Sequence, residues 1–493
     1  MNLLLLLDMA AAGRADEPAV VVDGDQITVG ELLAAAWSGA EIASGCDALA
    51  YVGTNGLAFP IGVFAAAAAG VPFVPLNYRL SDEQLHDLLA PLGDTLVIAD
   101  GDTGRALASA GHRVVDTETF VSRARGGETI GEVPGDGESP ALLLYTSGTT
   151  AAPKAAVLRH RHLTSYVIGT VEFGGAQPDE AVLVSVPPYH VAGLANLLSN
   201  LYLGRRIVYL RQFDAERWVD TVRRERITHA MVVPTMLARI CEVLEADGDG
   251  LPSLKALSYG GARTPATVLQ RAMALLADVD LTNAYGLTET SSTIAVLGPD
   301  DHRAARDGDP VAVARLSSAG KVLPTVEIEV RGPDGPLEPG EVGEIWVRGE
   351  QVSGEYAGVA APLDDEGWFP TRDRGSVDGD GYLFIEGRSD DTIIRGGENI
   401  APAEIEEALL QHPDIDQCAV VGVPDDEWGQ RIAVMVVARS GVELDEAGVR
   451  DFARQSLRGS KTPDVVVFTD ALPYTETGKL LRRQVQAELT AQR

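Results

Sequence analysis

Apolar runs of strand length alternate with stretches of helical periodicity along the N-terminal part of this chain. The strand-like runs cover residues 48–52, 95–99, 181–186, 206–210 and 230–233. The helix-like stretches cover residues 64–69, 83–92 and 217–224. Such alternation is typical of an α/β protein built on largely parallel sheets. A first helix is expected up to Arg14, because the leucine run 3–7 follows no basic residue and ends at Asp8, unlike a signal peptide.

The pattern changes between Val322 and Val347, where two strand-like runs flank the turn sequence Gly-Pro-Asp-Gly-Pro. Strand, turn and strand predict a small β-rich module within the large domain. A compact segment follows, with helical periodicity at residues 403–411 and strand-like runs at 417–422 and 432–437. We therefore expect an N-terminal domain of residues 1–388 and a small α+β domain of residues 389–493, with the boundary at Ser389 and Asp390.

The bulk composition excludes several classes of protein. A chain of 493 residues exceeds the size of one hydrophobic core, which agrees with two domains. The formal net charge of −32 should repel nucleic acids and anionic membranes, and no apolar run approaches the length of a membrane span. The three cysteines, Cys46, Cys241 and Cys418, lie far apart, which argues against disulfides or a zinc site. The expected location is the cytoplasm.

A group of hydroxyl side chains follows the apolar run 141–145. Thr146, Ser147, Gly148, Thr149 and Thr150 are consecutive, and Lys154 comes soon afterwards. Backbone N–H groups and hydroxyls can donate to phosphate oxygens, and an ammonium adds a compact positive charge. Only five of the 40 basic residues are lysines, so the chain otherwise prefers arginine. A polyphosphate-binding loop is expected here, with an ordinary surface turn as the alternative, although the spacing is not that of a G-x-x-x-x-G-K-[ST] loop.

Five further segments accompany this loop, at residues 187–193, 283–290, 367–373, 387–400 and 472–479. They include Pro-Pro-Tyr-His, Ala-Tyr-Gly-Leu-Thr-Glu, Trp-Phe-Pro-Thr-Arg-Asp, Gly-Arg-Ser-Asp-Asp and Thr-Gly-Lys. In order and spacing the six motifs resemble the acyl-adenylate-forming superfamily, which contains acyl-CoA synthetases, amino-acid adenylation domains and firefly luciferase. The resemblance runs from about residue 15 to about residue 485, nearly the whole chain.

This resemblance implies a two-step reaction. A carboxylate attacks the α-phosphate of ATP to give an acyl-AMP and pyrophosphate, and a thiol, usually that of CoA, then displaces AMP. The hydroxyl loop and Lys154 would hold the β- and γ-phosphates, and Thr288 would contact the α-phosphate. Glu289 would ligate Mg²⁺, as a hard oxygen donor should. Lys479 would bridge the carboxylate and the α-phosphate and stabilise charge in the first transition state.

The same resemblance implies a base pocket and a ribose site. Tyr285 would stack on the adenine, and neighbouring glycines would permit close approach of the backbone. The carboxylate of Asp373 and the guanidinium of Arg388 would bind the ribose hydroxyls. The expected nucleotide-binding residues beyond the loop are Gly260, Gly261, Ala262, Asn283, Tyr285, Gly286, Asp373 and Arg388.

The second step is expected to involve rotation of a mobile C-terminal domain about Asp390. In one orientation Lys479 would reach the nucleotide. In the other, the hairpin that follows the hinge would face the channel for the pantetheine arm of CoA, so that rotation assembles two sites in turn. The residues expected at that channel are Arg395, Gly396, Gly397 and Glu398. His190 would lie where the channel meets the acyl pocket.

Three residues depart from the superfamily pattern. Ala151 and Ala155 replace glycines that usually flank the loop lysine, and each would be strained by about 1–2 kcal/mol if its φ were positive. The usual Thr-Gly-Asp is here interrupted by Arg372, which can pair with Asp373, crowd the nucleotide or turn outward. Tolerated drift is the simpler interpretation. The alternative is an enzyme that adenylates poorly and passes acyl-AMP, supplied by an upstream enzyme, to CoA.

The expected acyl pocket is mostly apolar and of mixed size, which fits an aryl, alicyclic or medium-chain acid. The segment around His190 lacks the aspartate that amino-acid adenylation domains place there, which argues against an amino acid. The candidate lining residues are His190, Val191, Ala192, Gly193, Leu194, Thr235, Met236, Ala262, Leu287 and Ser292.

CoA is favoured over a carrier protein as the thiol acceptor. No carrier domain follows Arg493, and the interval from Glu289 to Glu344 lacks the long insertion typical of fatty-acyl-AMP ligases. An inactive nucleotide-binding homologue would be expected to lose Glu289 or Lys479, and both are present. Acetylation of Lys479, which would remove the charge needed in the first step, is a further hypothesis. The sequence carries no signal for the oligomeric state, and a homodimer is a working assumption.

Overall fold

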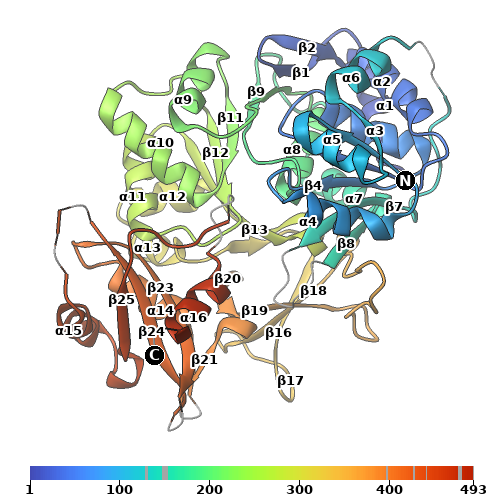
Figure 1. Ribbon diagram of the computed structural model, residues 1–493. Coiled ribbons are helices and arrows are strands. Elements are labelled where there is room, and N and C mark those ends of the chain that lie inside the picture. The colour runs from blue at the N-terminus through green and yellow to red at the C-terminus, as the bar shows by residue number, and fades with distance from the viewer. Residues whose placement is uncertain are drawn as a thin grey trace.

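The computed structural model describes residues 1–127, 131–146, 154–395, 398–425, 428–439, 441–442, 444–475 and 480–491. Two sheets form the large N-terminal domain, coloured blue to orange in Figure 1, and a third forms the small C-terminal domain in orange to red. The expected fold class, a large α/β domain with a small α+β domain, is confirmed. The short 3-10 turn η3 (Ser389–Asp391) lies between the domains, where the hinge is expected.

The first sheet is buried on both faces, as its near-continuous apolar strands predict. On one face Leu49 and Tyr51 pack against α2 (Val29–Ile42), α3 (Ala58–Ala69) and α6 (Thr117–Arg125). On the other face Ala50 and Val52 pack against α4 (Asp82–Leu89) and α5 (Gly101–Ser109). All neighbours are parallel except the last pair, β7–β8. The strand order is β6 (Arg113–Val115), β5 (Thr95–Ala99), β3 (Ala48–Val52), β4 (Phe73–Leu76), β7 (Pro140–Thr146), β8 (Lys154–Arg159).

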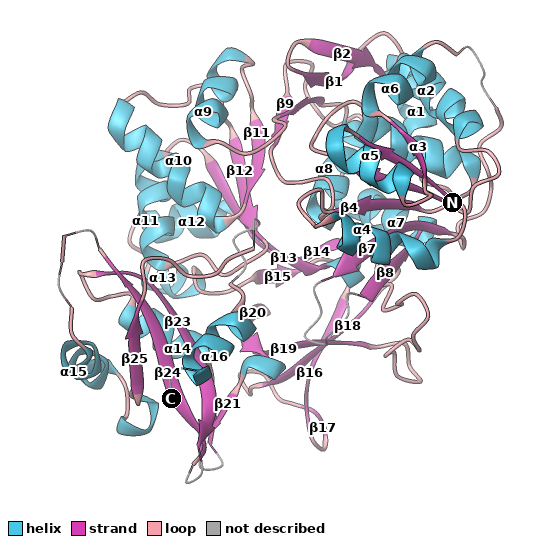
Figure 2. Cartoon of the chain, viewed as in Figure 1, coloured by secondary structure: helices cyan, strands magenta, loops and turns pink. Residues whose placement is uncertain are grey.

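The second sheet has a parallel half and an antiparallel half. In the parallel half, helices α9 to α12 cover one side of β11 and β12 (Figure 2). The strand order of this half, after the antiparallel edge strand β2 (Asp25–Thr28), is β1 (Pro18–Val22), β10 (Arg206–Tyr209), β9 (Ala181–Val184), β11 (His229–Val232), β12 (Ala256–Gly260), β13 (Asp280–Leu287). The remaining helices of the large domain are α1 (Leu4–Arg14), α7 (His160–Thr170), α8 (Val191–Leu203), α9 (Ala215–Arg224), α10 (Pro234–Asp247), α11 (Ala266–Leu275), α12 (Pro299–Arg306) and α13 (Pro310–Arg315).

The antiparallel half contains the β-rich module that the sequence predicts between Val322 and Val347. The hairpin of β13 and β14 turns the sheet from parallel to antiparallel, so the module continues the large sheet. Its strands, in order, are β14 (Ser292–Leu297), β15 (Gly320–Val322), β20 (Tyr382–Arg388), β19 (Phe369–Val377), β18 (Gly343–Arg348), β16 (Glu327–Gly332) and β17 (Gly335–Pro336).

The small domain packs helices on both faces of its own sheet. One face of β23 and β24 buries Ile405 and Val449 from α14 and α15, and the other buries Val485 and Leu489 from α16. The elements are β21 (Ile393–Arg395), β22 (Glu398–Ile400), α14 (Pro402–Leu409), β23 (Ile415–Asp425), β24 (Gly429–Ala438), α15 (Glu446–Ser456), the 3-10 turn η4 (Gly459–Lys461), β25 (Val465–Phe468) and α16 (Arg482–Ala491).

The elements expected from the sequence are present, with shifted ends. The helix expected at residues 64–69 begins earlier, at Ala58. Residues 58–67 of α3 are all buried, so the helix lacks the alternation of apolar and polar positions that would have marked its start. The segment 83–92 is split into α4 and the 3-10 turn η1 (Ala90–Leu92). All three cysteines are free and buried. Among the described residues, no helix is long and apolar enough to cross a membrane.

Candidate active site

Four of the predicted site segments meet at one edge of the large sheet. β9, β11, β12 and β13 are parallel neighbours, so the segments that leave their C-terminal ends emerge on the same side. His190 follows β9 and precedes α8, and Thr235 lies in the first turn of α10, after β11. Gly260 ends β12, and Glu289 lies in the 3-10 turn η2 (Thr288–Thr290) that follows β13. The edge therefore gathers the predicted acyl, base and metal residues.

Asp373 is the centre of a buried charge cluster and is only 5% exposed. Tyr285 Oη donates to its Oδ2 at 2.5 Å, and Arg388 Nη1 donates to its Oδ1 at 3.1 Å. Asp373 and Arg388 are directly opposed in the β19–β20 ladder, which fixes their distance. Burial, and then the charge of Asp373, raise the pKa of Tyr285 well above its ordinary value, so the phenol stays a donor. The structure thus brings together the three residues expected at the base and ribose.

Glu289 forms a second cluster with a tyrosine that the sequence analysis did not identify. Its side chain is 8% exposed, and Tyr356 Oη donates to its Oε1 at 2.5 Å. Lys154 Nζ lies 5.9 Å from the centre of the Tyr356 ring, a cation–π distance. Burial and the adjacent carboxylate raise the pKa of Tyr356, so this phenol also stays protonated.

A single carboxylate of this kind fits Mg²⁺. The ion usually binds proteins through one or two carboxylates, with substrate phosphates and water completing its octahedral shell. Tyr356 occupies Oε1 of Glu289, and in the described part of the chain Oε2 has no hydrogen-bond donor. The described residues contain no cluster of three or more metal ligands, so a cage made by the protein alone does not occur among them.

The hydroxyl loop connects β7 and β8. Thr146 and Lys154 are paired across this hairpin, so the loop has a rigid base. The central loop residues expected to bind phosphate lie outside the described residues, as do the expected catalytic lysine and part of the expected CoA hairpin. They are Ser147, Gly148, Thr149, Thr150, Gly396, Gly397 and Lys479.

Two of the glycines expected at the base pocket are required by the protein's own backbone. A Cβ on Gly260 would lie 2.2 Å from the carbonyl oxygen of Ala284 on the adjacent strand. One on Gly286 would lie 1.8 Å from the carbonyl oxygen of Ser292. Both strands would have to separate to admit a side chain. Asn283 Nδ2 donates to the carbonyl oxygen of Ser318 at 3.2 Å, which fixes the side chain within the sheet.

The residues that depart from the superfamily pattern have different environments. Ala155 is a paired residue of β8, so alanine there adds no strain. Arg372 has a φ of 61°, in the left-handed region that favours glycine. Its side chain is 55% exposed, and Nη1 lies 3.9 Å from Oδ2 of Asp390, the expected hinge residue. Ala151 lies outside the described residues.

The expected acyl-pocket residues come from four elements around the same edge. Val191, Ala192, Gly193 and Leu194 form the first turn of α8, which packs against β14. Met236 follows Thr235 in α10, Leu287 ends β13, and Ser292 begins β14. Tyr189 packs on the ring of His190, with 4.5 Å between centroids, and on Tyr78 at 5.9 Å. Tyr189 belongs to the motif found in the sequence but was assigned no role there, and Tyr78 was missed.

The hairpin expected to meet CoA begins with an arginine already bound within its own domain. Arg395 Nη2 donates to Asp464 Oδ1 at 2.8 Å, and Nη1 donates to the carbonyl oxygen of Ser460 at 2.8 Å. Glu398 is its partner across the β21–β22 hairpin. These contacts fasten the two expected CoA residues that are described, Arg395 and Glu398, to the small domain.

Comparisons with known proteins agree with the sequence motifs. The family model described as AMP-binding enzyme matches residues 7–357, and that of the AMP-binding enzyme C-terminal domain matches residues 404–479. A feruloyl-CoA synthase from Amycolatopsis is 35% identical over 447 residues, covering 89% of this chain and 88% of that protein. An indoleacetate–CoA ligase from Aromatoleum aromaticum is 34% identical over 458 residues, covering 89% and 87%.

Solved structures show the same architecture. An o-succinylbenzoate CoA synthetase from Bacillus subtilis, in complex with its acyl-adenylate intermediate, matches with a TM-score of 0.86 and 27% identity. The match covers 98% of this chain and 97% of that chain. The same synthetase in complex with ATP and a magnesium ion matches with a TM-score of 0.83.

Proposed function

Because the chain belongs to the family of AMP-binding enzymes and is an AMP-forming acid–CoA ligase, we propose that its acid substrate is an aryl carboxylic acid. The relatives just described act on feruloyl, indoleacetate and succinylbenzoate groups, which all carry an aromatic ring. The pocket candidates on α8, α10, β13 and β14 carry no charge, which suits a neutral ring.

The observation that carries the assignment of the nucleotide site is the pair of neighbouring clusters around Asp373 and Glu289. Asp373, held by Tyr285 and Arg388, presents a carboxylate suited to two ribose hydroxyls. Mg²⁺ would bind at Glu289 and neutralise phosphate charge when ATP is present. The ammonium of Lys154 lies beside that position and would hold the outer phosphates.

The acid would attack the α-phosphate from the pocket side of the sheet edge. In-line displacement needs alignment and charge stabilisation more than covalent help from the protein. Thr288 would contact the α-phosphate, and Lys479 would stabilise the charge that develops between acid and phosphate. Rotation about Asp390 would then bring Arg395 and Glu398 towards the bound acyl-AMP for the second step.

In a second candidate function, the protein only transfers acyl groups from acyl-AMP to CoA. It is favoured by one observation, the left-handed backbone at Arg372, directly beside the ribose carboxylate. An upstream enzyme would then have to supply the acyl-AMP. We favour the complete reaction, because the described ion pair of Arg372 is with Asp390 rather than with Asp373, and Ala155 fits its strand without strain.

Product analysis by mass spectrometry separates these possibilities. The pure protein is incubated with ATP, Mg²⁺, CoA and a pool of aryl, alicyclic and medium-chain acids, and a parallel reaction receives synthetic acyl-AMPs. Aryl-CoA products in both reactions would support the proposal. Products from medium-chain or alicyclic acids alone would overturn the aryl assignment, and products from acyl-AMP alone would support the second candidate. Asp373→Asn serves as the control that lacks the ribose carboxylate, and it should weaken both reactions, because ATP and acyl-AMP carry the same ribose.

A further inference from the structure

Residues 353–357 form a short extended segment, here called the strap, that joins the phosphate loop to the expected metal ligand. The strap lies along β8 and bonds to it at both ends. Val157 N donates to the carbonyl oxygen of Glu355 at 2.9 Å, and Ala357 N donates to that of Ala155 at 2.9 Å. Because β8 begins at Lys154, directly after the phosphate loop, the strap is fixed to the base of that loop.

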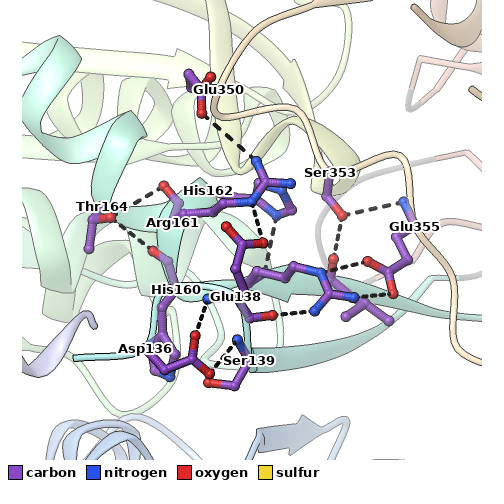
Figure 3. Close-up of polar contacts among 12 residues, drawn as sticks. Asp136, Glu138, Ser139, His160, Arg161, His162, Thr164, Glu350, Ser353 and Glu355 are labelled. Atoms are coloured by element: carbon purple, nitrogen blue, oxygen red, sulfur yellow. Dashed lines mark hydrogen bonds and ion pairs between the residues drawn. The ribbon is translucent and has the colours of Figure 1, made fainter. Parts of the chain in front are cut away.

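Side chains fasten the strap to β8 as well. Arg159, at the end of β8, makes a two-pronged ion pair with Glu355, with Nε–Oε2 at 2.9 Å and Nη2–Oε1 at 2.8 Å. Figure 3 shows Ser353 and Glu355 reaching from the strap towards β8. Ser353 Oγ donates to the carbonyl oxygen of Val157. Paired guanidinium and carboxylate groups of this geometry define an orientation as well as a distance.

The other face of the strap meets η2. The backbone N of Ser353 donates to the carbonyl oxygen of Glu289 at 2.8 Å. Three residues later, Tyr356 Oη donates to the Glu289 carboxylate at 2.5 Å. Both the main chain and the side chain of Glu289 are therefore held by one segment. The carboxylate loses rotational freedom, and Oε2 is left as the oxygen for a cation.

We propose that Tyr356 is a positioning residue for the metal, which orients Glu289 towards Mg²⁺, and that the Arg159–Glu355 pair holds Tyr356 in place. The inference rests on the proposed role of Glu289 as metal ligand. A hydroxyl that donates to a ligating carboxylate fixes its orientation, and loss of such a partner typically weakens metal binding about 10- to 100-fold. The strap also fixes the distance between β8, which begins at Lys154, and the expected metal ligand Glu289.

Metal binding tests the proposal directly. Mn²⁺ binding to the full-length protein is measured by electron paramagnetic resonance in the presence of a non-hydrolysable ATP analogue, and AMP affinity is measured without metal. Tyr356→Phe should raise the Mn²⁺ dissociation constant about tenfold while AMP affinity stays within about twofold. Tyr382→Phe is the matched control, because Tyr382 Oη also donates to a carboxylate, that of Asp301, at 2.7 Å. It should change neither value.

Two more variants separate the possible failures. Glu355→Gln removes the ion pair without touching the metal site and should raise the Mn²⁺ dissociation constant about threefold, as expected for a contact one step removed. Unchanged Mn²⁺ affinity in Tyr356→Phe overturns the positioning role, and unchanged affinity in Glu355→Gln overturns the role of the strap. Unchanged affinity in Glu289→Gln would instead show that Glu289 is not the ligand, so that the proposed site itself fails.

Discussion

At the scale of single residues, three residues other than glycine near the candidate site have strained backbone conformations. Arg372 has a φ of 61°, and Ser291 and Ser292, which follow η2, have φ values of 57° and 118°. Residues other than glycine rarely adopt backbone conformations with positive φ. Each costs about 1–3 kcal/mol and is found mostly where the surrounding structure enforces it. All three residues adjoin the Asp373 or Glu289 cluster, so the strain accompanies the placement of those carboxylates.

Arg372→Gly should relieve part of this strain. The free energy of unfolding is expected to rise by about 1 kcal/mol, because glycine adopts the left-handed conformation freely and the lost ion pair with Asp390 is exposed and weak. Chemical denaturation monitored by fluorescence measures the change. ATP–pyrophosphate exchange in the same variant tests adenylation, and a rise of more than tenfold would support the transfer-only candidate.

Two buried histidines at the start of α7 determine how stability depends on pH. His160 and His162, both labelled in Figure 3, are 0% and 1% exposed. Both use Nδ1 to accept a backbone N–H, from Leu3 and Arg159 respectively. Burial lowers the pKa of His160 to about 4, against a smaller opposing effect of Asp136. Burial and then the neighbouring arginines lower the pKa of His162 to about 3.

As the pH is lowered, the protein should therefore begin to lose stability at a higher pH than titration of its carboxylates alone would cause. An unfolded histidine takes up a proton near pH 6.5, whereas the folded imidazoles stay neutral to about pH 4 and about pH 3, so the unfolded state binds more protons throughout this window. The contribution of the two neutral histidines to the free energy of unfolding is fully present above pH 6.5 and decreases as the pH falls. Between pH 7 and pH 4.5, His162 contributes a loss of about 2–3 kcal/mol. Urea unfolding of His162→Gln should show that much less loss than the wild type, and parallel curves would contradict the assignment.

At the scale of elements, one ion pair fastens the last helix to the small domain. Arg482, the first residue of α16, donates to both oxygens of Glu406 on α14, at 2.6 and 2.7 Å. Glu406 also accepts the backbone N–H of Val420, and Arg482 donates to the carbonyl oxygen of the same residue. Both side chains are largely buried, so each charge depends on the other. The pair ties two helices on opposite faces to the sheet strand β23.

Removal of one charge should weaken the whole small domain. Glu406→Gln removes the carboxylate that pairs with both Nη atoms of the buried Arg482 guanidinium and leaves Asp391, with Nε–Oδ2 at 3.5 Å, as its remaining partner. Breaking a buried pair in this way typically costs about 3 kcal/mol. Hydrogen exchange in β23 and β24, followed by mass spectrometry, should become faster by about a hundredfold or more. The matched control is Glu446→Gln, which breaks the exposed pair with Arg450 on α15 and should cost less than about 0.5 kcal/mol. Equal effects of the two substitutions would contradict this account.

At the scale of the whole molecule, the two domains meet through exposed charges. Arg263, which follows the base-pocket segment, pairs with Glu407 of α14 at 2.7 Å, and both side chains are about half exposed. Arg372 faces Asp390 at the hinge. Exposed pairs of this kind contribute about 0–1 kcal/mol each. Weak contacts would suit the expected rotation of the small domain between two orientations.

Glu407→Gln should therefore shift the balance between orientations without unfolding the protein. The population of the orientation described here is expected to fall by up to about fivefold, as loss of one exposed pair allows. The two half-reactions, ATP–pyrophosphate exchange and CoA transfer from supplied acyl-AMP, should then change in opposite directions. The melting temperature should be unchanged. Parallel changes in both half-reactions would argue against a shift in domain orientation.

Much of the fold could be predicted from the chain because its signals are local. The strands at residues 48–52 and 95–99 are found at those bounds, since a run of four or five consecutive apolar residues between polar turns favours a buried strand. The fully buried helix α3 was placed only in part, because a helix without a polar face has no periodicity to read. Candidate site residues within a continuous motif, such as residues 283–290, could be identified from the sequence because their signal is also local.

The sequence by itself determined the fold class and the family, because these follow from motifs and patterns whose residues are neighbours in the chain. It also predicted the chemical groups that would meet ATP. Only the tertiary structure decided which groups touch. Tyr356 was missed because its partner, Glu289, lies in another element, and no spacing within the segment Gly-Glu-Tyr-Ala-Gly predicts that contact. The direction of Arg372 was open to three interpretations for the same reason. Long-range pairings follow from the packing of sheets and loops, which a one-dimensional pattern does not contain.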